Sequence, residues 1–152
     1  MSNNYLQFST AVIIPPDKVE FVMKAIVKAL REFLVEGKVR GAYLEDTDLV
    51  LVDNEYRAHL GGTEIVSEPG QIWIYGEEAG DIDVAICAIE TIQTVLQLDE
   101  PHVFSWAYTC SKMILDEFGG GAVQCRRGHV TETIDAYQVA RNLELKKVPI
   151  GQ

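Results

Sequence analysis

The pattern of apolar and polar positions along the chain predicts two long helices. Apolar residues recur at the i, i+3 and i+4 spacing of an amphipathic helix from Val19 to Leu34. A second run, from Asp81 to Leu98, is apolar on almost every side, and Glu90 is its only charged residue beyond the first turn. Asp81 is a suitable N-cap residue for this helix. An apolar surface all the way round predicts a helix that is buried on more than one side.

Period-two alternation and turn signals predict the strands. The strand at 5–14 ends at Pro15-Pro16, and Asp17 and Glu20 then have the spacing of a capping box for the first helix. A hairpin is predicted from 63–67 and 71–76 around the turn Glu68-Pro69-Gly70, and a third amphipathic helix over 135–145. The remaining predicted strands are 48–53, 103–110, 122–125 and 130–134.

The order of these elements predicts a single α+β domain over residues 1–152. A strand followed by a helix occurs twice, at 5–35 and at 71–98, without a repeat in the sequence itself. This order favours helices on one face of a mainly antiparallel sheet, in a ferredoxin-like layer. A chain of 152 residues has the size of one domain with a real core.

The charge of the chain limits its partners. The net charge is −10, and residues 41–101 hold fourteen carboxylates against one basic residue, Arg57. Such a surface repels phosphates, so nucleic-acid binding is unlikely on physical grounds, whereas mimicry of nucleic-acid charge toward a protein partner stays open. No segment has the roughly 18 consecutive apolar residues of a membrane span. The N-terminus has no secretory signal pattern and the three cysteines lack CxxC spacing, so we expect a cytoplasmic protein with reduced thiols.

Five aromatic rings are predicted to share the sheet face that the helices leave open. The prediction places Ile72 and Ile74 under the helices, together with the small residues of strand 103–110, because small side chains suit close packing of a helix on a sheet. The rings on the open face are then Trp73, Tyr75, Phe104, Trp106 and Tyr108. They could contact a second subunit, line an apolar ligand pocket or stack bases, although no basic residues interleave them for base stacking. If the strands instead turn these rings toward the helices, the five rings are ordinary core residues.

A glycine run and its basic neighbours form a candidate anion site. Gly119, Gly120 and Gly121 could present backbone amides to a small anion or a phosphate, with Lys112 and Arg126 beside them. The GxxxxGK[ST] order of a P-loop is absent. The alternative is a loop that needs positive φ near a bulge.

The cysteines and histidines indicate neither covalent catalysis nor a metal site. Cys110 lies beside Lys112, but His102 is eight residues back on the same strand, about 26 Å away at full extension. A buried or turn cysteine is therefore the favoured interpretation. Cys110, Cys125 and His129 lack the CxxC or HxxxH spacing of common zinc sites. We expect no catalytic residues, no metal and no cofactor.

Two segments, WAYTCSK at 106–112 and FGGGA at 118–122, resemble a family of small bacterial and phage- or plasmid-borne proteins that has no assigned activity. Met113 stands where that family commonly has a proline after the lysine. The resemblance implies a cytoplasmic α+β protein of mobile-element origin. It implies no catalytic residues.

These observations predict a homodimer that acts by binding, because the helix at 81–98 and the ring face together offer more apolar surface than one small domain can bury. The predicted role is that of a regulatory or accessory protein that binds another protein, and not of an enzyme. The alternative is a small-ligand or anion-binding protein, or a weak enzyme, that uses Lys112, Gly119–Gly121 and the ring face.

Overall fold

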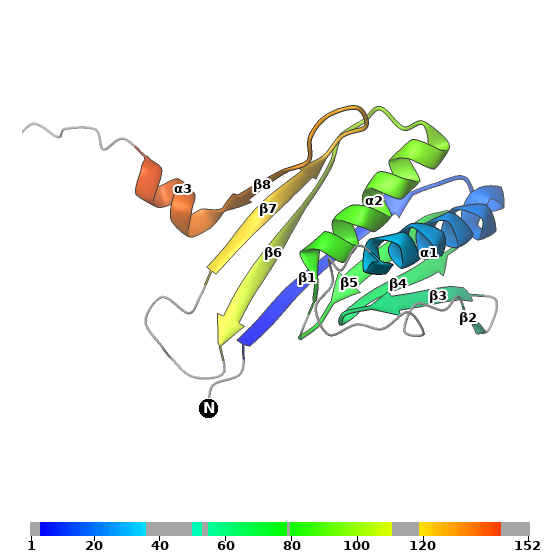
Figure 1. The fold of residues 1–152 in the computed structure, drawn as a ribbon, viewed down its shortest axis with the longest axis horizontal. Helices are drawn as coiled ribbons and strands as arrows, with labels where there is room; N and C mark the ends of the chain where they lie inside the picture. The colour runs from blue at the N-terminus through cyan, green and yellow to red at the C-terminus, as the bar shows by residue number, and fades with distance from the viewer. Residues whose placement is uncertain (1–3, 36–49, 53–54, 79, 111–118, 144–152) are drawn as a thin grey trace, which may run out of the picture.

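The computed structural model describes residues 4–35, 50–52, 55–78, 80–110 and 119–143, and it confirms the α+β class. Helices α1 (Val19–Val35) and α2 (Ile82–Leu96) lie side by side on one face of an eight-stranded sheet (Figure 1). A 3₁₀ turn (Pro16–Lys18) precedes α1, and α3 (Ala136–Asn142) follows the last strand. The strands are β1 (Asn4–Ile13), β2 (Val50–Val52), β3 (Glu55–Leu60), β4 (Thr63–Glu68), β5 (Gln71–Gly76), β6 (His102–Cys110), β7 (Gly119–Cys125) and β8 (Glu132–Asp135).

The sheet is antiparallel throughout its described pairs, in the order β2-β3-β4-β5-β1-β6-β7-β8. It consists of two meanders, β2 to β5 and β6 to β8, which are joined through β1. Strand β1 pairs antiparallel with β5 on one side and with β6 on the other. The expected ferredoxin-like layering is not confirmed: the strands β4, β5, β1 and β6 that flank the two helices are extended by β2 and β3 on one edge and by β7 and β8 on the other.

The core lies between the sheet and the two helices. Strand β5 buries Ile72 and Ile74 completely, whereas Trp73 and Tyr75, which alternate with them, remain half-exposed. Side chains of a strand alternate between its two faces, so the helices cover the even-numbered face of β5. The fully buried residues of the helices are Val22, Met23, Ile26 and Leu30 of α1, and Val84, Ala85, Ala88, Ile89 and Ile92 of α2.

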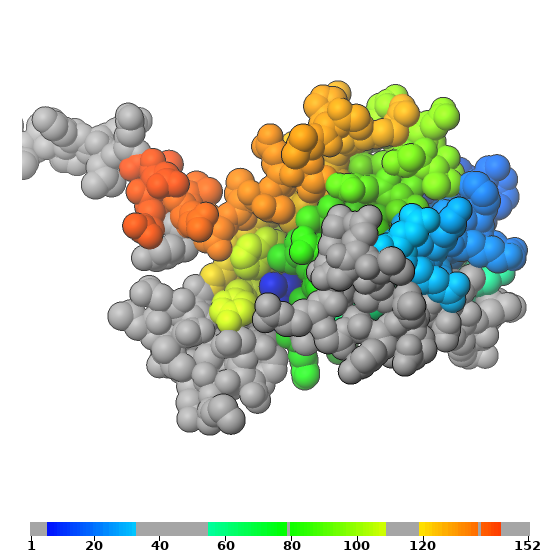
Figure 2. All heavy atoms as spheres, in the orientation of Figure 1, coloured from blue at the N-terminus to red at the C-terminus, as the bar shows by residue number. Residues whose placement is uncertain are grey.

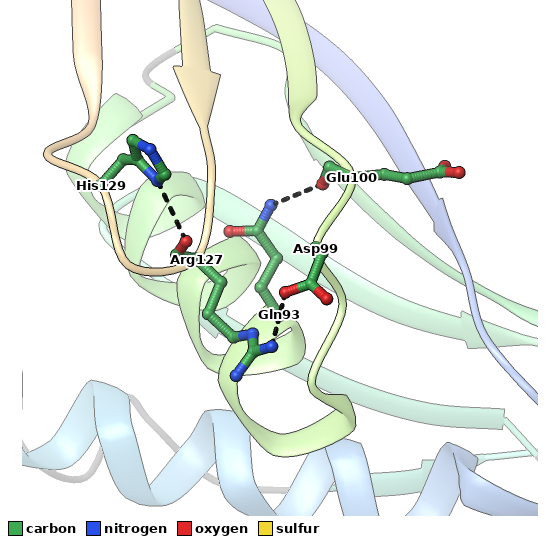
Figure 3. A network of polar contacts seen from close by, with 5 residues as sticks. All are labelled: Gln93, Asp99, Glu100, Arg127 and His129. Carbon is green, nitrogen blue, oxygen red and sulfur yellow. Dashed lines mark hydrogen bonds and ion pairs between the residues drawn. The ribbon is translucent and has the colours of Figure 1, made fainter.

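Helix α2 packs against α1, against the sheet and against the segment that joins β7 to β8, which lies beside it in Figure 2. Its buried Gln93 donates from Nε2 to the carbonyl oxygen of Cys125 at 2.7 Å and to that of Glu100 at 3.5 Å. An ion pair between Arg127 and Asp99 closes the same end of the helix (Figure 3). Contacts within a single chain therefore cover much of the apolar surface of α2.

The N-terminal end of α2 forms as the sequence predicts, but the start of α1 does not. The carboxylate of Asp81 accepts hydrogen bonds from the backbone nitrogens of Asp83 at 2.9 Å and Val84 at 3.3 Å. Asp17 and Glu20 form no capping box: Asp17 lies in the 3₁₀ turn, and Glu20 pairs with Lys24 one turn along α1.

Strand β3 was not predicted, although its sequence carries a clear signal. Tyr56, Ala58 and Leu60 alternate with charged or polar residues and face the helices. The strand expected at 48–53 corresponds in part to β2, and its other residues lie outside the described part of the chain.

The glycine run forms part of a strand and not a loop, so the loop expected there is wrong. Gly119, Gly120 and Gly121 pair with Tyr108, Ala107 and Trp106 of β6. None of the three has a positive φ, in contrast to Gly61, Gly62, Gly70 and Gly128. Gly121 is required for another reason: a Cβ built on it would lie 2.7 Å from the Trp106 ring and 2.0 Å from the carbonyl oxygen of Ile134.

We predict that Gly121→Ala lowers the free energy of unfolding by about 2–3 kcal/mol, because the added methyl group must displace a backbone oxygen and a packed indole. Gly119→Ala is the matched control, since its Cβ meets no atom within 4 Å. Urea denaturation of both variants measures the difference. Equal stability of the two variants would show that the Trp106 ring does not rest on Gly121.

Candidate functional site

The sheet face opposite the helices is the candidate site, and the register of the strands defines its residues. Paired residues on adjacent antiparallel strands point to the same face. Tyr75 pairs with Ser9, and Gln7 pairs with Ala107, so all four lie on the face that α1 and α2 do not cover. We call this surface the open face. Its centre has a floor of small or polar exposed side chains: Gln7, Ser9, Ala11, Ser105 and Ala107.

The five predicted rings divide between the two faces. Trp73 and Tyr75 lie on the open face, as expected. Phe104, Trp106 and Tyr108 lie on the helical face, so their assignment to the open face is wrong. The pairing of Trp106 with the buried Phe8 fixes this parity, and Phe104 is itself 4% exposed with its ring centroid 5.7 Å from that of Phe8.

The two open-face rings form a stack beside the floor. Their centroids are 4.1 Å apart and their planes are inclined by 26°. The indole nitrogen of Trp73 donates to Ser9 Oγ at 2.8 Å, which directs the indole across β1. A hollow of about 730 Å³ lies over this region. It is lined by the stack and by Gln7, Phe8, Ser9, Gly76, Glu77, Glu78, Ser105, Trp106 and Ala107. The stack is therefore one wall of a surface hollow whose base is the sheet.

A second hollow, of about 500 Å³, lies next to the first and shares Tyr75, Glu77 and Glu78 with it. Glu64 and Arg57 complete its lining with Gly62. Burial raises the pKa of Tyr75, and the carboxylate of Glu64 is the next cause of this rise. The charge of Arg57 acts in the opposite direction and lowers the pKa of Tyr75.

The carboxylates around the stack form no ion pair with a basic side chain among the described residues. Within the part of the chain that the structure describes, the side chains of Glu64, Glu77 and Glu78 make no hydrogen bond or ion pair. The nearby guanidinium of Arg57 pairs with Glu55 at 3.2 Å. The two hollows together therefore present aromatic surface and uncompensated negative charge.

The residues predicted for an anion site are not brought together. Lys112 lies outside the described residues. Arg126 follows the last residue of β7, about 23 Å along the strand from Gly119 at the usual rise per residue. Gly120 and Gly121 lie inside the strand ladder, and the pairing of Gly121 with both Trp106 and Asp135 leaves no amide concavity at that position.

Of the two thiols whose side chains the structure describes, Cys125 is buried and Cys87 is half-exposed. Burial raises the pKa of the Cys125 thiol to about 11, which keeps it protonated at neutral pH. The side chain of Cys110 lies outside the described residues. His102 shares a hydrogen bond with Thr10 Oγ1 at 2.6 Å, and burial lowers its pKa. The described residues contain no group of three or more His, Cys, Asp or Glu side chains that could hold a metal ion.

The fold and the site define an α+β protein with one helix-covered sheet face and one open, acidic and aromatic face. No family model, curated protein or solved structure matches the chain. No helix in the described ranges has both the length and the apolar character needed to cross a membrane.

We predict that native Cys125 resists alkylation. A pKa of about 11 leaves roughly 100-fold less thiolate at pH 8 than the ordinary cysteine pKa of 9.0 does. Timed iodoacetamide labelling followed by peptide mass spectrometry measures this, with the half-exposed Cys87 as the internal reference. Cys125 should label only after unfolding in urea, and native labelling at the rate of Cys87 would contradict its burial.

Proposed function

We propose that this protein acts by binding another protein through its open face, as a cytoplasmic regulatory or accessory factor, and not by catalysis. The observation that carries the proposal is the Trp73–Tyr75 stack beside an uncovered floor of small residues. Aromatic residues are enriched in the central part of protein interfaces, because their rings bury a large area at a low cost in conformational entropy. A flat floor allows close approach of a partner.

The chemistry of the open face supports binding over catalysis. Its described polar groups are carboxylates, amides, hydroxyls and one arginine, and no histidine, cysteine or lysine lines either hollow. General acid–base chemistry at neutral pH needs a group with a pKa near the working pH within hydrogen-bonding reach of the substrate.

We expect a photo-crosslinking residue at Ala107 on the open face to give an adduct of higher mass in cells of the native host. The matched control places the same residue at Thr94, which is exposed on α2. Adducts that depend on the Ala107 position support an open-face partner. Adducts only from Thr94, or from neither position, contradict the proposal.

We also propose a homodimer. The support for it is a set of exposed apolar side chains near the end of the described chain. Apolar side chains are exposed along β8, α3 and their flanks: Val130 at 88%, Ile134 at 53%, Val139 at 41% and Leu143 at 63%. Helix α3 extends away from α1 and α2 (Figure 2), and its contacts are with β7 and β8. A second copy related by a two-fold axis would bury this arm against itself or against the partner's sheet.

Light scattering at micromolar concentration should give twice the mass of the 16.9 kDa chain. Val139→Asp combined with Leu143→Asp should shift the protein to a monomer, because each buried charge would oppose association. Phe21→Asp on α1 is the control for an exposed apolar residue, since Phe21 is 60% exposed and far from the arm in the chain. A monomer for the unmodified chain would rule out the dimer.

A further inference from the structure

We infer that the partner segment received by the open face is an extended, basic stretch of polypeptide, with lysine or arginine side chains seated between the Trp73–Tyr75 stack and the carboxylates of Glu77 and Glu78. This inference rests on the proposed function and specifies the chemistry of its partner.

Charge complementarity is the first argument. Glu64, Glu77 and Glu78 surround the stack without a counter-charge from the described residues, and the one basic side chain in the hollows is already paired with Glu55. A neutral or acidic partner would cover these carboxylates without pairing them, at a cost in desolvation. A basic partner supplies the missing charges and gains speed of association from the net charge of −10.

The aromatic stack favours a cation that is carried on a long aliphatic side chain. A cation over an indole or phenol ring is attracted by the negative face of the ring. The side chains of lysine and arginine also carry long aliphatic stems that pack on aromatic surface while the charged group reaches out to a carboxylate. Tyr75 lines both hollows and Glu77 follows it by two residues, so one side chain can contact both.

The shape of the surface favours a polypeptide over a small cationic ligand. Pockets for small ligands are concave and enclose most of the ligand. Here the floor residues Gln7, Ser9, Ser105 and Ala107 are all exposed, so the hollow lies on the surface of the sheet. The two hollows share three residues and form one continuous track from the floor at β6 to Gly62 beyond β3. A continuous shallow track fits an extended chain.

The test uses a synthetic peptide of about twelve residues that alternates lysine and serine, since this length in extended form exceeds the width of several strands. Peptides that alternate glutamine or glutamate with serine serve as the neutral and acidic comparisons. Calorimetry with the full chain should detect binding of the basic peptide alone. The affinity should fall at least fivefold between about 50 mM and about 300 mM NaCl, because screening weakens exposed charge pairs.

Matched variants separate a local site from general attraction to an acidic protein. Glu77→Gln with Glu78→Gln should weaken binding of the basic peptide at least fivefold. Glu32→Gln with Glu100→Gln changes the net charge by the same amount at exposed positions outside both hollows, and should change binding less than twofold. All four residues are exposed, so thermal unfolding should confirm that both variants fold.

Equal weakening in the two double variants would overturn the inference, since it would show attraction to net charge alone. Binding of the neutral peptide as tightly as the basic one would also overturn it. If no peptide binds while crosslinking at Ala107 persists, the basic partner is wrong and the open-face function stands. If crosslinking at Ala107 also fails, the proposed function falls with it.

Discussion

The burial of Phe8 and Val12 beneath the two helices is the contact on which the arrangement of the whole sheet depends. Strand β1 lies at the centre and joins the two meanders, so its parity sets which side chains every other strand turns to the helices. The Phe8 ring needs space in order to be buried at this position. A Cβ on Gly76 or Gly80 would lie 3.2 Å or 2.6 Å from that ring, so these two glycines form its seat. A shift of one residue in β1 would exchange the core face and the open face.

This constraint explains which parts of the site the sequence could predict. Trp73 and Tyr75 alternate with Ile72 and Ile74, and two isoleucines in a short strand indicate the buried face without further information. Strand β6 gives no such indication of its buried face. Its large rings alternate with the small residues Ser105 and Ala107, and this alternation alone does not say which set faces the helices. There the parity depends on the partner strand, and only the pairing of Trp106 with Phe8 decides it.

The glycine run shows a second limit of reasoning from local sequence. Three consecutive glycines favour a loop, because glycine tolerates positive φ. In the fold, the requirement at Gly121 comes from Trp106, which lies fifteen residues earlier and directly opposite on β6. The Trp106 ring thus lies where a side chain at position 121 would otherwise stand. Strand β3 is a different case, because Tyr56, Ala58 and Leu60 alternate with charged or polar residues in the local sequence itself.

The division between the two faces also accounts for how one small chain can be both stable and acidic. The helical face holds nearly all the fully buried apolar residues, so folding depends little on the carboxylates of the open face. The Glu64, Glu77 and Glu78 side chains are left free to keep their charges in water, at little cost to the core. Each such charge contributes little to affinity by itself, because exposed pairs are worth about 1 kcal/mol or less. Specificity at this surface must therefore come from several charges acting together with the Trp73–Tyr75 stack, whose indole is directed by its hydrogen bond to Ser9.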